Sequence, residues 1–193
     1  MKMESRIHWF PRRHLPGILA GLLCLYPALA PCEQPALDGP NIQFNDDLSD
    51  KLAGTWKITG TVMGQKASQT AEAEWVLGHQ FMRLHMKEPA PKTKTPGGEP
   101  PYEAMVFIGY DNTSERYVAH WIDTFGGRFS ETLGYGSRSG DTIKFVFEYP
   151  DGPFHTSFTF DPASKGWRVL MRTKDKSGKW MDFADTTWSR KGK

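Results

Sequence analysis

The side chains in this sequence best suited to chemistry are acids placed among aromatic rings. Tyr117, Trp121 and Asp123 fall at alternate positions of one predicted strand, 116–123, so their side chains share a face. An acid next to two aromatic rings can meet the polar end of a ligand, and it can equally cap the end of the strand. Both interpretations of Asp123 stay open at the level of the sequence.

A second acid has a similar setting. Glu131 shares one face of a predicted strand over 128–135 with Phe129, Leu133 and Tyr135. Burial among such rings disfavours the charged form of a carboxyl group unless a cation lies nearby. The alternative is that this face is the exterior and the intervening residues point inward. A period of two does not decide which face lies inside when both faces are mixed.

Other catalytic and metal-binding patterns are missing from the sequence. The histidines after residue 32 do not have the spacing of a zinc site. There is no Gly-x-Ser-x-Gly nucleophile motif and no glycine-rich loop for phosphate. We therefore expect no metal and no cofactor, and we assign no catalytic residue. The four histidines concerned are His79, His85, His120 and His155.

The elements that position these side chains follow from a pattern repeated about ten times between Leu52 and Trp188. In each repeat, apolar residues occupy every second position of a run of about seven to ten residues that ends in Gly, Asp, Asn or Pro, which is typical of antiparallel strands joined by tight turns. The strands are expected to begin at Gly54 and to continue over 68–77, 80–87, 102–110, 116–123, 128–135, 142–149, 154–160, 165–174 and 180–188.

Sequential strands with one apolar face must bury that face, and a closed barrel does so while removing both sheet edges. The sequence thus predicts an all-β, up-and-down antiparallel barrel. A short helix within 44–52, capped by Asn45 or Asp46, precedes the first strand and is placed to plug one end. The proline-rich segment 88–101 is either a surface loop or a lid at the barrel mouth.

One strand offers two candidate inner faces. In 165–174, Trp167, Val169 and Met171 alternate with Arg168 and Arg172. Inward arginines would suit a carboxylate ligand. The apolar set makes the better inner face, so we expect the arginines to point outward.

The pattern of the first 32 residues predicts a secretory signal peptide, which is not part of the fold. Arginines precede an apolar run, 15–30, that ends in the small residues Ala28, Leu29 and Ala30. The run is shorter than the roughly 20 residues of a membrane-spanning helix, so we expect export to the periplasm or the medium and no stable membrane span. The expected domains are a signal peptide over 1–32, a linker over 33–43 and a barrel over 44–193.

Removing the leader changes the charge balance. The whole chain carries 24 basic and 22 acidic residues. Four of the basic residues and one acid precede residue 33, which leaves 20 basic and 21 acidic residues and a net charge of −1. A nearly neutral domain argues against nucleic acid as a partner. Both cysteines, Cys24 and Cys32, lie in the leader, so the domain must be stable through packing.

A family resemblance supports the barrel. The short helix followed by Gly54 and Trp56 resembles the start of lipocalins and other members of the calycin superfamily. Segment 74–78, the run Gly109, Tyr110, Asp111, Asn112 and the run 121–123 are similar to the bacterial family called domain of unknown function 1579. This resemblance implies a lipocalin-like barrel in exported or periplasmic proteins, and it brings no catalytic residues. Independently of it, Asp111 and Asn112 suit a hairpin turn.

We therefore expect a barrel that binds an apolar or amphipathic small molecule in its interior. One alternative is an enzyme using Asp123, Glu131 or His120 as acid or base, which the sequence favours less. Another is a non-catalytic envelope protein that binds a partner through its outer face. The sequence sets neither the ligand's identity nor an oligomeric state. The candidate ligand-binding residues are Trp121, Asp123, Phe129, Glu131, Tyr135, Phe145, Phe147, Phe158 and Trp167.

Overall fold

A computed structural model describes residues 43–90 and 100–192, all within one unit of the chain, Gly39–Lys193. The expected signal peptide, nearly all of the expected linker and most of the proline-rich segment lie outside the described residues. The elements are α1 (Asp47–Asp50), β1 (Gly54–Val62), β2 (Gln65–Val76), β3 (Phe81–Lys87), β4 (Glu103–Asp111), β5 (Arg116–Asp123), α2 (Gly127–Ser130), β6 (Leu133–Ser139), β7 (Thr142–Tyr149), β8 (Gly152–Asp161), β9 (Gly166–Lys174) and β10 (Trp180–Arg190).

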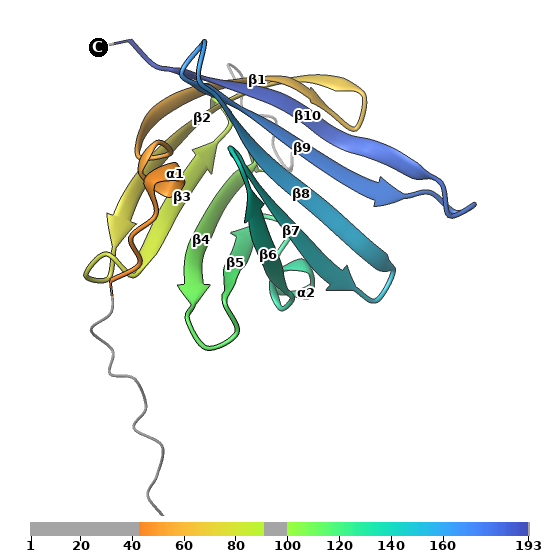
Figure 1. Cartoon of the computed structure of the whole chain (residues 1–193). Helices are drawn as coiled ribbons and strands as arrows, with labels where there is room; N and C mark the ends of the chain where they lie inside the picture. Colours follow the sequence, from red (N-terminus) through yellow and green to blue (C-terminus); the bar gives the residue numbers. More distant parts are fainter. Residues whose placement is uncertain (1–42, 91–99, 193) are drawn as a thin grey trace, which may run out of the picture. The chain divides into compact units, whose positions relative to one another are not determined.

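The ten strands form a closed antiparallel barrel in which each strand pairs with the next and β10 returns to β1 (Figure 1). This confirms the all-β, up-and-down architecture expected from the alternating pattern. None of the helices among the described residues is long and apolar enough to cross a membrane. The barrel has two ends: the α1 end, where β1 begins and β10 finishes, and the opposite end, where β1 finishes and β10 begins.

At the α1 end, the single turn of α1 is held by its cap and by burial. The Asp46 carboxylate accepts hydrogen bonds from the backbone N–H groups of Leu48 and Ser49, at 3.3 and 3.1 Å. Leu48 is fully buried. A helix this short has little stability of its own, so its position depends on these contacts with the barrel.

The Gly-x-Trp motif fixes the floor of the barrel. The Trp56 indole is fully buried, and its Nε1 donates to the Leu52 carbonyl oxygen at 2.7 Å. The Arg190 guanidinium lies 4.0 Å from the centre of the Trp56 ring and donates to the Lys51 carbonyl at 2.9 Å. A Cβ added at Gly54 would lie 2.0 Å from this guanidinium. Glycine is therefore required so that the arginine can reach beneath the indole.

The inner face of β9 is the expected one. Trp167 and Val169 are each 1% exposed, whereas Arg168 points outward and donates two hydrogen bonds of 2.8 Å to the Asp185 carboxylate. The carboxylate-gripping arrangement of inward arginines is therefore absent from this strand.

The predicted strand 128–135 is wrong in its first half. Residues 127–130 form α2, and β6 begins only at Leu133. Gly126 turns the chain with a φ of 86°, and the Ser130 hydroxyl donates to the Gly126 carbonyl oxygen at 3.1 Å. As a result, β6 pairs with β5 through only four residue pairs, from Tyr117↔Gly136 to His120↔Leu133.

The inner face of β6 explains why the apolar residues of this strand point outward. Its inward positions are Gly134 and Gly136, and a Cβ at Gly134 would lie 2.5 Å from the Phe147 ring. The rings of Phe145 and Phe147 fill the space that side chains of β6 would occupy. The apolar residues of β6 consequently lie on its outer face, which inverts the usual pattern.

Candidate functional site

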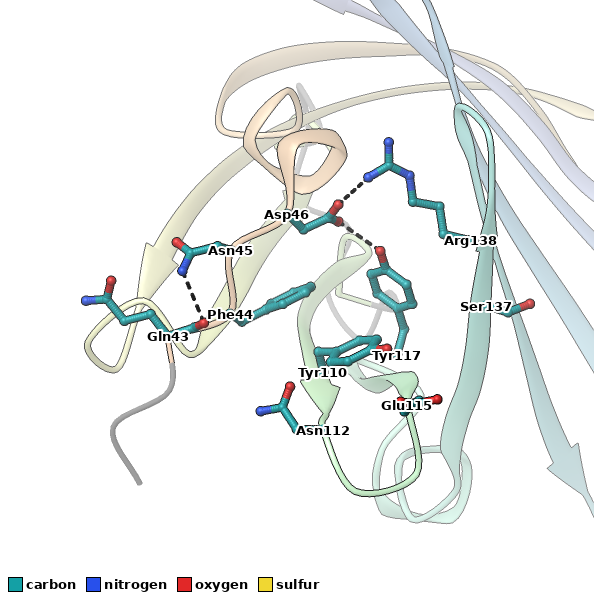
Figure 2. Close-up of a pocket in the computed structure, with 10 residues that line it drawn as sticks. All are labelled: Gln43, Phe44, Asn45, Asp46, Tyr110, Asn112, Glu115, Tyr117, Ser137 and Arg138. Atoms are coloured by element: carbon teal, nitrogen blue, oxygen red, sulfur yellow. Dashed lines mark hydrogen bonds and ion pairs between the residues drawn. The ribbon is translucent and has the colours of Figure 1, made fainter. Parts of the chain in front are cut away.

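At the α1 end, four charged or polar residues form a group that we call the Asp46 cluster: Asp46, Asp47, Tyr117 and Arg138. The Asp46 carboxylate is 7% exposed and accepts from the Tyr117 hydroxyl of β5 at 3.1 Å and from Arg138 Nη1 of β6 at 2.5 Å (Figure 2). Arg138 Nη1 also donates to Asp47 at 2.6 Å. Because the β5–β6 ladder ends at Tyr117↔Gly136, Asp46 joins the two strands just where their main-chain pairing stops.

The electrostatics of the Asp46 cluster agree with a structural role. Burial, together with the charge of Asp46 and the hydrogen bond to it, raises the pKa of the Tyr117 hydroxyl to about 12. The hydrogen bond from Arg138 is the largest cause that lowers the pKa of the Asp47 carboxyl. Tyr117 thus stays neutral, and the Asp47–Arg138 ion pair stays charged, over the ordinary range of pH.

A hollow of about 520 Å³ lies beside this cluster (Figure 2). Its aromatic wall includes the stacked pair Phe44 and Tyr110, with ring centres 5.6 Å apart. The acceptors of Asp46 and the donors of Arg138 are already engaged inside the protein. The hollow is lined by Gln43, Phe44, Asn45, Asp46, Tyr110, Asn112, Glu115, Tyr117, Ser137 and Arg138.

At the opposite end, a hydrogen-bonded chain runs along the inner wall. Trp121 Nε1 donates to the Tyr102 hydroxyl oxygen at 3.1 Å, and that hydroxyl donates to Asp123 Oδ2 at 3.3 Å. Asp123 Oδ1 accepts from the Phe125 backbone N–H at 2.9 Å. Asp123 therefore caps the end of β5, as one interpretation of the sequence expected, and its side chain lies on the inward face of the strand.

The same acid influences its aromatic neighbours. Burial, followed by the charge of Asp123, raises the pKa of the Tyr102 hydroxyl above its usual range. Burial and Asp123 likewise raise the pKa of the Tyr149 hydroxyl. Both hydroxyls are thus held in the neutral form, in which they can donate hydrogen bonds.

Partly buried inward-facing side chains lie at both ends of the barrel. At the α1 end, the indoles of Trp56, Trp167 and Trp188 are at most 1% exposed, whereas Trp75, Tyr110 and Phe160 are only partly buried. At the opposite end, solvent reaches the rim of the inner wall. The partly buried side chains there are Tyr102, Trp121, Tyr149, Phe154 and Met171.

One buried polar group in the interior is unpaired. Thr156 faces inward from β8 between Phe145 of β7 and Met171 of β9, and it is 1% exposed. Its hydroxyl oxygen forms no hydrogen bond with any described residue. An unpaired buried hydroxyl is costly, and such a group calls for a specific explanation.

The nine predicted ligand-binding residues separate into three groups. Trp121 and Asp123 lie together on the inner wall at the opposite end. Four aromatic residues, namely Phe145, Phe147, Phe158 and Trp167, are buried in the core. Phe129 on α2 is 45% exposed and Tyr135 is 40% exposed, stacked under Arg116 on the outer side. Glu131 is exposed at the end of α2 rather than enclosed among rings.

The residues of the sequence motif have structural roles. The Asp111 carboxylate accepts from the Thr113 backbone N–H at 3.0 Å, as a hairpin turn requires. A Cβ at Gly109 would lie 2.6 Å from the Phe81 ring, so this glycine lets the ring cover β4. Tyr110 and Asn112 line the hollow beside the Asp46 cluster.

Sequence reasoning missed several contributors to the two ends. Tyr102 directly follows the prolines at 100 and 101, where the alternating pattern starts again. Its place on the inner wall could therefore be predicted from the sequence. Its hydrogen bond to Asp123 could not. Arg138 lies in a polar stretch after the expected end of its strand. No local signal indicated that it meets Asp46 from 92 positions earlier.

A second hollow, of about 320 Å³, lies on the outer face of β7, β8 and β9. It contains the cations Lys144, Arg168 and Arg172, of which the two arginines are paired with Asp185 and Asp182. Within residues 43–90 and 100–192, no group of three or more His, Cys, Asp or Glu side chains is placed to hold a metal ion.

A closed ten-stranded barrel with a short helix and a Gly-x-Trp floor defines a lipocalin-like protein. The chain belongs to the family described as "Protein of unknown function (DUF1579)", whose model matches residues 47–190. No curated protein matches the chain. The match confirms the family resemblance seen in the sequence.

Proposed function

We propose that this protein binds an apolar or amphipathic small molecule inside the barrel, and that the ligand enters at the end opposite α1. The observation that carries the proposal is the unpaired hydroxyl of Thr156 in an otherwise apolar interior. A ligand with a polar atom near Thr156 would satisfy that hydroxyl. The partly buried aromatic side chains of the inner wall mark the route from solvent to it.

The proposed affinity comes mainly from apolar contact. Burial of apolar surface contributes about 25 cal/mol per Å², so a ligand enclosed by aromatic rings gains several kcal/mol without a large polar network. The Tyr102–Asp123 pair supplies a polar group where the ligand would meet solvent.

Binding of a neutral fluorescent probe, N-phenyl-1-naphthylamine, tests this proposal. We expect saturable fluorescence enhancement with the native protein. Ala104→Phe, which adds a ring to the inner wall between Met86 and Asp123, should weaken binding at least about tenfold, equivalent to about 1.4 kcal/mol. The matched control is Met105→Phe, because Met105 is the next residue and faces outward. Equal binding by both variants and the native protein would place the probe outside the barrel.

We also propose export, with the protein acting in the periplasm or outside the cell. Support comes from the leader-like character of residues 1–32 in the sequence. Mass spectrometry of the protein recovered from its own host's envelope fraction tests export, and under native conditions it also tests ligand binding. We expect a new N-terminus near Ala30 to Cys32 and a co-purifying small mass under native conditions. Intact residues 1–32 on a cytosolic protein would contradict export.

A further inference from the structure

The charge of the inner wall indicates what kind of ligand head group the barrel accepts. Of the inward-facing strand residues described in the half of the barrel away from α1, Asp123 carries the only charge. Its position is fixed by its register partner, Ala104, which is 1% exposed and belongs to the core. The other wall residues in this half are apolar or neutral.

No ion pair joins Asp123 to a described cation. Two cations near this end are engaged on the outer side of the barrel: Lys87 lies 3.4 Å from Glu103, and Arg128 lies 3.7 Å from Asp151. A second acid adds to the negative charge, because Glu88 Oε2 accepts from the Tyr102 backbone N–H at 3.1 Å. A ligand carboxylate or phosphate placed here would face like charge in a partly desolvated site.

Aromatic residues lie beside the carboxylate. Tyr102 donates directly to Asp123, Trp121 donates to the Tyr102 hydroxyl, and the rings of Tyr102 and Phe125 lie 5.7 Å apart. A carboxylate beside aromatic rings attracts ammonium groups, since the charge and the ring quadrupoles both favour a cation. A quaternary ammonium group needs no hydrogen bond, so the two hydrogen bonds that Asp123 already accepts do not block it.

We infer that the ligand is a cationic amphiphile, with an alkyl or aromatic body inside the barrel and an ammonium-type head at Asp123. This inference rests on the proposed function, and it adds the charge of the ligand's polar end. It predicts selectivity against fatty acids and other anionic amphiphiles of the same chain length.

Three ligands that share a ten-carbon chain, used below their critical micelle concentrations, test the inference by displacing N-phenyl-1-naphthylamine from the native protein. They are decyltrimethylammonium, decanol and decanoate. We expect decyltrimethylammonium to bind about tenfold more tightly than decanoate, with decanol between them. Stronger or equal displacement by decanoate would overturn the inference while leaving the proposed function intact. Failure of the neutral probe to bind at all would instead contradict the proposed function.

The variant Asp123→Asn tests the role of the charge directly. Asparagine removes the charge but keeps an oxygen that can accept from the Phe125 N–H. We expect this variant to lose most of the preference for decyltrimethylammonium and to keep its affinity for decanol. Asp151→Asn is the matched control, since Asp151 is an exposed acid at the same end of the barrel. If Asp123→Asn does not fold, the salt dependence of the native protein decides: decyltrimethylammonium should bind more weakly at high ionic strength, and decanol should not.

Discussion

At the scale of single residues, Thr156 is expected to lower the stability of the ligand-free protein. Its unpaired hydroxyl costs stability in the empty barrel, and valine has nearly the same shape without the hydroxyl. We expect Thr156→Val to raise the free energy of unfolding of the ligand-free protein by about 1 kcal/mol. Urea unfolding of the two proteins measures this difference. A less stable variant would mean that the hydroxyl has a partner, such as an ordered water.

Tyr117 gives a second prediction at this scale, through alkaline pH. Its folded pKa of about 12 exceeds the ordinary value of 10.0, so the folded state holds the proton more tightly than the unfolded state. This contribution to stability is complete below pH 10 and is lost as pH rises toward 12. Tyr117→Phe should therefore flatten the fall in stability between pH 10 and pH 12.

Part of the fall in stability with pH should remain in Tyr117→Phe, because the pKa values of Tyr102 and Tyr149 are also raised. The measurement is the urea midpoint at several alkaline pH values, with tyrosinate absorbance followed in parallel. An unchanged slope in Tyr117→Phe would show that its hydroxyl titrates in the same way in both states.

At the scale of elements, the junction of β5 and β6 is the weakest part of the barrel wall. Only four residue pairs join these strands, and the Asp46 cluster holds them together beyond the last pair. Removing the Asp46 carboxylate takes an acceptor from the Tyr117 hydroxyl and from the Arg138 guanidinium. It also removes the cap of α1. We expect Asp46→Ala to cost about 2–4 kcal/mol of unfolding free energy.

Asn45→Ala is the control for this change. Asn45 is the adjacent residue, is exposed, and makes one local hydrogen bond to the Gln43 carbonyl at 3.3 Å. Chemical denaturation of both variants gives the comparison. Hydrogen exchange should also accelerate first in β6 of Asp46→Ala, and protection that falls evenly over all strands would contradict a local role.

The inner face of β6 makes another prediction for this element. A methyl group at Gly134 would meet the Phe147 ring at 2.5 Å, so Gly134→Ala forces the ring or the strand to move. Overpacking of this kind costs about 1–3 kcal/mol. Gly127→Ala is the control, because a Cβ there meets nothing within 4 Å. Thermal unfolding of the two variants should differ accordingly, and similar midpoints would show that Phe147 adapts without cost.

At the scale of the whole molecule, the two barrel ends are built differently. One end carries α1, buried indoles and the Asp46 cluster, whereas partly buried aromatic side chains form the rim of the inner wall at the other end. A ligand that binds the folded state alone stabilises it by about 2.7 kcal/mol at a concentration of 100 times Kd. Decyltrimethylammonium should thus raise the melting temperature of the native protein.

The same experiment on Ala104→Phe supplies the control. The added ring should suppress the rise in melting temperature without removing the folded state. A ligand-dependent shift that is equal in both proteins would indicate binding at the outer surface instead.

Much of the barrel was predictable because strand alternation and turn chemistry are local properties. The bounds of β5 and β7 agree with the sequence pattern to the residue, and the outward position of Arg168 followed from the better apolar face of β9. Asp123 was recognised as a candidate for the same reason, because alternation alone places it beside Trp121. Its capping role is observed in the structure, and its role towards a ligand stays a proposal.

What only the tertiary structure decided are the long-range contacts and the choice of inner face where side chains are missing. Glycines at the inward positions of β6 hid its inner face, so Tyr135 could not be placed by alternation, and Phe129 and Glu131 belong to α2 and its C-cap rather than to a strand. The contact of Asp46 with Arg138 crosses 92 positions of sequence. The sequence by itself determined the strands because each strand's periodicity is carried within it. Only barrel closure brings distant polar groups together, so it alone decided which of them are paired and which are left unpaired.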